Sequence, residues 1–182
     1  NILGTLQKPV KPDALRGLLN RFDPNNTNVS KGSGIEPLTE EELIAGLACD
    51  ELHVVYQPKV SVRERRMEGI EALARWNHPT RGMLGPGAFI GLAETTGHID
   101  ALTEGVFSKA MAQAGQWRAD GLELNVSVNF SVDTLSRFDL PEFLISTAEA
   151  EGMDPGLVIL EVTESRVMED VRAPLEILTR LN

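Results

Sequence analysis

Met67 to Trp76 reads M-E-G-I-E-A-L-A-R-W and decides the fold of this 182-residue chain. Side chains alternate between the two faces of a β-strand, so this stretch places its small and apolar side chains together: Ile70, Ala72, Ala74 and Trp76. Glu71, Leu73 and Arg75 share the opposite face. If that face is wet, Glu71 and Arg75 are simply solvated charges. If it is covered, both charges need another explanation.

Two further segments have the pattern of strands that are covered on both faces. Residues 122–132 alternate apolar and polar side chains, and two predicted helices separate them from the first stretch, which is the spacing of a parallel crossover. Parallel sheets are covered on both faces, so we expect Asn129 to be shielded from bulk water. Residues 157–165 place Glu161 among large apolar side chains, where a carboxylate is costly unless it is paired, hydrogen-bonded or bound to metal.

The whole chain alternates predicted strands and helices, which is typical of an α/β fold. Strands are expected at 52–62, 67–76, 122–132 and 157–165, with a loop at 77–86 and helices at 86–97, 100–119, 141–151 and after 174. This order predicts repeated βα units from a TIM-type barrel or a doubly wound sheet, and such folds carry function at the carboxyl ends of their strands.

Three successive units supply Glu71, Asn129 and Glu161, which are all oxygen donors. Two carboxylates and an amide oxygen suit Mg²⁺ or Mn²⁺, whereas the lack of Cys and His beside them argues against zinc. The alternative left open by the residues alone is that Asn129 and Glu161 form internal hydrogen bonds with the backbone.

Composition limits the partners and the compartment. A net charge of −10 argues against DNA or an anionic membrane as the main partner. The single cysteine, Cys49, excludes an internal disulfide framework and is typical of a reducing compartment. No apolar run approaches the ~20 residues of a membrane span. We therefore expect a cytoplasmic protein.

The chain is expected to divide into three parts. Residues 1–20 contain a short strand pattern, a Lys8-Pro9 step and an amphipathic helix, and they resemble the C-terminal end of a response-regulator receiver domain, in which Lys8 would contact phosphate. Residues 21–37 are rich in Asn, Gly, Ser and Pro, the composition of a linker. A domain at 38–182 then opens with a capping box formed by Thr39 and Glu42.

That domain resembles the EAL family of cyclic di-GMP phosphodiesterases. Five motifs occur in the family's order: Y-Q-P at 56–58, E-A-L-x-R-W-x-H-P at 71–79, F-I-x-x-A-E-x-T-G at 89–97, V-N-x-S at 128–131 and L-E-x-T-E-S at 160–165. The resemblance implies a modified TIM-type barrel whose first strand, here 52–62, runs antiparallel. It also implies metal ligation by Glu71, Asn129 and Glu161, with Mg²⁺ or Mn²⁺ as the cofactor.

The same resemblance assigns roles to further residues. Gln57, Leu73 and Arg75 are expected to contact the nucleotide, and Glu164 matches the second acid of the E-x-T-E motif, which orders a loop beside the catalytic site. The implied reaction is metal-dependent hydrolysis of cyclic di-GMP to linear pGpG, with water as the nucleophile. The implied partners are cyclic di-GMP, a second copy of the chain in a homodimer, and an upstream sensor kinase that acts on the receiver.

The sequence leaves two alternatives in which the protein is not an enzyme. The family's later motifs, an Asp-Asp-Phe-Gly step and a further lysine and glutamate, would fall after residue 182, so residues 38–182 are expected to form only the N-terminal portion of a barrel. A catalytically inactive cyclic di-GMP receptor of the same fold is therefore the second hypothesis. An unrelated α/β scaffold is a third, and it would require five motif matches by chance.

Overall fold

The computed structural model of the chain describes residues 36–163 and 172–180. The chain divides into two units, Asn1–Pro37 and Leu38–Asn182, and the fold below belongs to the second. The segment predicted as the end of a receiver domain lies outside the described residues, as do most of the predicted linker and Glu164. Those three assignments therefore stay predictions.

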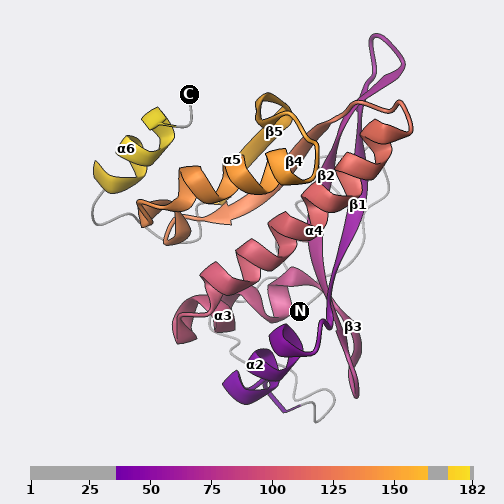
Figure 1. Cartoon of the computed structure of the whole chain (residues 1–182). Helices are drawn as coiled ribbons and strands as arrows, with labels where there is room; N and C mark the ends of the chain where they lie inside the picture. The colour runs from indigo at the N-terminus through magenta and orange to yellow at the C-terminus, as the bar shows by residue number, and fades with distance from the viewer. Residues whose placement is uncertain (1–35, 164–171, 181–182) are drawn as a thin grey trace, which may run out of the picture. The chain divides into compact units, whose positions relative to one another are not determined.

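The second unit is built on a five-stranded sheet (Figure 1). Its strands are β1 (Leu52–Ser61), β2 (Arg66–His78), β3 (Gly82–Leu84), β4 (Asn125–Ser131) and β5 (Val158–Thr163). Hydrogen-bonded neighbours follow the order β1-β2-β4-β5, and β3 pairs with the end of β2. β1 is antiparallel to β2, whereas β2, β4 and β5 are mutually parallel. The predicted antiparallel first strand and parallel crossovers are confirmed.

Helices connect the parallel strands. The described α-helices are α2 (Glu40–Ala48), α3 (Ile90–Thr96), α4 (Ile99–Ala119), α5 (Leu140–Ala150) and α6 (Arg172–Arg180), with 3₁₀ turns η1 (Pro86–Ala88), η2 (Thr134–Ser136) and η3 (Pro155–Leu157). Gly97 ends α3 with a φ of 77°, a left-handed conformation that glycine adopts without strain. Among the described helices, none is both long enough and apolar enough to cross a membrane.

The two faces of the sheet differ as the alternation predicts. One face is made of apolar side chains that are each at most 4% exposed: Ile70, Ala72, Trp76, Val126, Val128 and Phe130. α4 lies along this face (Figure 1), and its Phe107 packs against Phe130 with ring centroids 6.2 Å apart. The opposite face of β2 and β4 carries the polar side chains, so it is the face on which a site can form.

The segment between β2 and η1 is more ordered than predicted. The sequence predicts a loop over residues 77–86, but β2 continues to His78, and β3 pairs back onto it through His78↔Gly82 and Trp76↔Leu84. Gly82 has a φ of 70°, a conformation that allows the chain to reverse tightly. In the sequence, the prolines and glycines of this segment indicate only that helix or strand is interrupted. The loop prediction is therefore wrong for this short hairpin.

α2 begins with a capping box and packs against β2. The predicted capping box is present, since the Glu42 amide donates to Thr39 Oγ1 at 3.2 Å and the Thr39 amide donates to Glu42 Oε2 at 2.9 Å. Gly46 lies against the indole of Trp76, where an added Cβ would come within 2.7 Å. Trp76 Nε1 donates to Glu51 Oε2 at 2.9 Å. The start of the domain is thus anchored to the strand that carries Glu71.

Close packing of α4 against the end of α5 depends on a glycine. A Cβ on Gly115 would collide with the backbone carbonyl oxygen of Glu151, which cannot rotate away as a side chain can. We expect Gly115→Ala to lower the free energy of unfolding by about 1–3 kcal/mol, measured by urea denaturation.

Gly105 provides the matched control in the same helix, because nothing lies within 4 Å of a Cβ at that position. Gly105→Ala should raise the free energy of unfolding by about 0.5–1 kcal/mol through helix propensity alone. Equal effects of the two substitutions would contradict this account of the α4–α5 contact.

Candidate active site

The parallel register brings the predicted metal ligands onto one face of the sheet. Gln57 of β1 lies opposite Glu71 of β2, and Asn129 of β4 lies opposite Glu161 of β5. Paired residues in a sheet project from the same face, and Ser127, the partner of Glu71 on β4, projects there with them. Residues distant in sequence therefore share one polar face across four strands.

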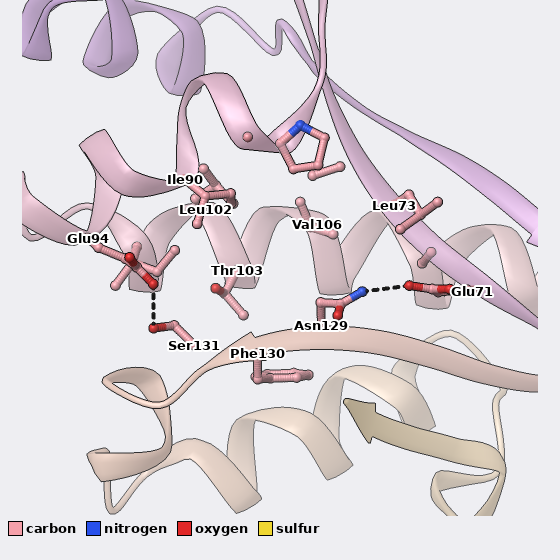
Figure 2. A pocket seen from close by; sticks show the side chains of 15 residues that line it. Glu71, Leu73, Ile90, Glu94, Leu102, Thr103, Val106, Asn129, Phe130 and Ser131 are labelled. Carbon is pink, nitrogen blue, oxygen red and sulfur yellow. Dashed lines mark hydrogen bonds between the residues drawn. The ribbon is translucent and has the colours of Figure 1, made fainter. Parts of the chain in front are cut away.

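Glu71 and Asn129 meet directly. Asn129 Nδ2 donates to Glu71 Oε1 at 2.9 Å (Figure 2), and both side chains are half-buried. This contact joins adjacent parallel strands and gives the Glu71 carboxylate a neutral partner. The sequence-based expectation that the two residues lie together is confirmed by the hydrogen bond, whereas their metal role remains a prediction.

Glu161 is held by a different partner. Lys59 Nζ forms an ion pair with Glu161 Oε1 and donates to Ser127 Oγ at 2.7 Å. The hydrogen bond from Lys59 is the main cause that lowers the pKa of the Glu161 carboxyl; partial burial opposes it, and a hydrogen bond with Ser127 adds to it. Glu161 is therefore ionised at neutral pH, as a cation ligand must be.

The ion pair between Lys59 and Glu161 also shows that the sheet is curved. β1 and β5 are separated by three strand spacings, which amount to about 14 Å in a flat sheet. Side chains stand roughly perpendicular to a sheet, so contact over that span requires the polar face to be concave. The polar face thus lines the inside of a curved sheet, as in a barrel.

A cavity of about 380 Å³ opens beside Glu71 and Asn129. β2 and β4 stop pairing after Ala72↔Val128, and η1, α3 and α4 cover the space between the diverging strands. Figure 2 shows its two polar ends, with Glu71 and Asn129 at one and the pair Glu94 and Ser131 at the other, where Ser131 Oγ donates to Glu94 Oε1 at 3.1 Å. The wall between them is mostly apolar: Leu73, Ile90, Leu102, Val106 and Phe130.

The structure brings together some of the predicted site residues and not others. Glu71, Leu73 and Asn129 line the cavity. Gln57 is exposed on the same face as Glu71, and Arg75 Nη1 donates to the Ala74 carbonyl at 2.7 Å; neither is among the residues that line it.

Sequence reasoning missed Lys59, Ser127 and the pair of Glu94 with Ser131. Lys59 lies two residues after Gln57 and so shares its face, which is the signal that could have identified it. Glu94 lies in one quoted motif and Ser131 in another, but no spacing along the chain indicates that they meet.

The donor set suits a hard divalent cation. Among the described residues, no group of three or more His, Cys, Asp and Glu side chains could hold a metal ion, so a cation here would depend on two carboxylates, the Asn129 amide oxygen and water. Mg²⁺ is commonly held by one or two carboxylates while it keeps several waters. Glu71, Asn129 and Glu161 therefore fit such an ion.

The EAL domain family matches residues 40–182. The chain belongs to the EAL domain family. This agrees with the five motifs and with the antiparallel β1, which lies beside three parallel strands.

Curated relatives carry names from cyclic di-GMP metabolism. Cyclic di-GMP phosphodiesterase NbdA of Pseudomonas aeruginosa is 38% identical over 143 residues, which cover 78% of this chain and 18% of NbdA. Cyclic di-GMP phosphodiesterase RocR of the same organism is 30% identical over 182 residues, which cover 100% of this chain and 46% of RocR. The chain spans less than half the length of these relatives.

Solved structures show the same fold. The PaMucR phosphodiesterase in complex with c-di-GMP superimposes with a TM-score of 0.71 at 37% identity, over 78% of this chain and 57% of that one. The EAL enzyme Bd1971 superimposes with a TM-score of 0.70 at 24% identity, over 78% of this chain and 40% of that one, and supports the fold alone. The fold is thus an EAL fold of the TIM-barrel type, and the described sheet forms part of it.

The hydrogen bond between Glu71 and Asn129 predicts how an added charge would behave. Asn129→Asp would place two carboxylates at hydrogen-bond distance. We expect the free energy of unfolding in EDTA to fall by about 1–3 kcal/mol, and Mg²⁺ or Mn²⁺ to restore it by binding between the charges.

Differential scanning fluorimetry with and without metal measures this effect. Asn125→Asp is the matched control, because it makes the same change on the same strand, where the Asn125 amide donates to the Glu68 carbonyl at 3.1 Å. Equal recovery of both variants in metal would contradict a cation site at Glu71 and Asn129.

Proposed function

We propose that this protein hydrolyses cyclic di-GMP to linear pGpG in a reaction that depends on Mg²⁺ or Mn²⁺. The observation that carries the proposal is the pairing of Glu71 with Asn129 at one end of a mainly apolar cavity. Pockets of this size with a few convergent polar groups commonly bind small molecules. Membership of the EAL family and the phosphodiesterase names of NbdA and RocR supply the substrate class.

In this proposal, three residues hold the cation. Glu71, Asn129 and Glu161 provide oxygen ligands, and the hydrogen bond from Asn129 fixes the Glu71 carboxylate before the ion arrives. A bound divalent cation would supply Lewis-acid stabilisation of the phosphoryl oxygens and would lower the pKa of a water nucleophile. This chain's contribution is to hold the two carboxylates on one face of the sheet, with Glu71 at one end of the cavity.

The remaining predicted residues are assigned to the substrate. Arg75 lies on the same face as Glu71, four residues further along β2, and its guanidinium would bind a phosphoryl oxygen as the scissile bond breaks. Gln57 would contact the nucleotide by hydrogen bonds. Leu73 would supply an apolar surface for a base, since it lines the cavity. Glu164 would order a loop beside the catalytic site.

The cellular context is also proposed from the sequence. Residues 1–20 would be the end of a receiver domain and residues 21–37 its linker, so that a sensor kinase would control the phosphodiesterase in a cytoplasmic homodimer. The alignment with RocR spans the whole chain, which supports a homologous N-terminal segment.

The proposal is tested by incubating the protein with cyclic di-GMP and Mg²⁺ or Mn²⁺. Formation of pGpG is measured by chromatography. Glu71→Gln should reduce kcat by at least about 100-fold, since even partners outside the ligand shell commonly cost 10–100-fold. Glu68→Gln is the control, because Glu68 lies on the same strand, is exposed and lies near Arg66.

The result decides between the two hypotheses for the family. Turnover that is lost in Glu71→Gln and kept in Glu68→Gln supports the enzyme. Binding of cyclic di-GMP without turnover would establish the receptor instead, and absence of both would contradict the proposed substrate.

A second prediction concerns Arg75. Arg75→Met should lower kcat/KM by about tenfold or more, because a hydrogen bond to a charged group contributes about 1.5–3 kcal/mol. Arg66→Met provides the control at the other end of β2, where Arg66 pairs with the exposed Glu64. An unchanged kcat/KM in Arg75→Met would remove this residue from the substrate contacts.

A further inference from the structure

Lys59 crosses the polar face of the sheet to reach Glu161. It lies on β1 just before a register shift and opposite Gly69 of β2. Because Gly69 has no side chain, it presents no obstacle on this face between Lys59 and β4. The ammonium group then contacts Ser127 Oγ on β4 and Glu161 Oε1 on β5.

The two carboxylates of the proposed cation site therefore have different partners. Glu71 accepts a hydrogen bond from the neutral Asn129 amide, whereas Glu161 is paired with a full positive charge. An ammonium nitrogen and a divalent cation compete for the same carboxylate oxygen, and they repel each other when both are near it. A metal ion that uses Glu161 must displace Lys59 or share the carboxylate with it.

We propose that Lys59 is an internal counter-ion that competes with the divalent cation for Glu161 and so sets the metal affinity of the site. Lys59 is a positioning residue in this account, because it acts through Glu161. The inference rests on the proposed function, in which Glu161 is a metal ligand. It goes beyond that function by naming the residue that weakens metal binding.

An ordinary structural salt bridge predicts a different outcome. The Lys59 and Glu161 side chains are 41% and 33% exposed, and exposed pairs contribute little to stability. If Lys59 only held Glu161 in position, its removal would leave metal affinity unchanged or would weaken it. If Lys59 competes with the ion, its removal must strengthen metal binding.

A titration of the protein with Mn²⁺ in the absence of nucleotide distinguishes these cases. The electron paramagnetic resonance signal of free Mn²⁺ reports how much of the ion is bound. Lys59→Met and Lys59→Gln should each bind Mn²⁺ on the order of tenfold more tightly, since a unit charge at close range repels a divalent ion even where solvent screens part of the interaction. Lys59→Gln keeps hydrogen-bonding capacity toward Ser127 and Glu161, so it covers the case in which Lys59→Met fails to fold.

Lys109→Met is the matched control for net charge, because Lys109 pairs with the exposed Asp50 on α4's side of the sheet. It should bind Mn²⁺ within about twofold of the wild type, as a distant charge is screened by salt. Equal or weaker binding in both Lys59 variants would overturn the inference. Glu161→Gln distinguishes failure of this inference from failure of the proposed function. Unchanged Mn²⁺ binding in that variant would overturn the metal role of Glu161.

Discussion

The structure depends on one constraint, the parallel register of β2, β4 and β5. Each register pair fixes which side chains share a face, so Glu71 lies level with Ser127 and Asn129 lies level with Glu161. A shift of one residue in any strand would move its polar side chains into the apolar layer under α4. The buried apolar residues of β2 and β4 therefore position the polar ones, and the core and the site are specified together.

Charge on the polar face is balanced locally. Two carboxylates on the inside of a curved sheet are costly unless each has a partner, and the structure supplies an amide for Glu71 and an ammonium for Glu161. These partners orient both acid groups without a metal ion, and the hydrogen bond from Lys59 lowers the pKa of the Glu161 carboxyl. In a chain with a net charge of −10, placed cations such as Lys59 and Arg75 are also what would allow an anionic phosphodiester to approach.

Local patterns in the sequence predicted the parts of the fold that depend on local chemistry. The alternation in β2 and β4, the capping box of Thr39 and Glu42, and the helix end at Gly97 each follow from a few adjacent residues. The β3 hairpin was not predicted, because prolines and glycines mark a break in structure without specifying a turn. The ion pair of Lys59 with Glu161 joins residues 102 positions apart and exists only because the sheet curves. Likewise, Glu94 and Ser131 meet only once α3 covers the end of β4.

In the proposed function, Glu71, Asn129 and Glu161 bind one divalent cation on the polar face of the sheet. A crystal of the protein grown with Mn²⁺ and measured at the manganese absorption edge tests it most directly. We expect an anomalous peak with oxygen atoms of these three residues as ligands, and Lys59 Nζ withdrawn from the Glu161 carboxylate. A peak elsewhere, or none with the ion pair intact, would contradict it.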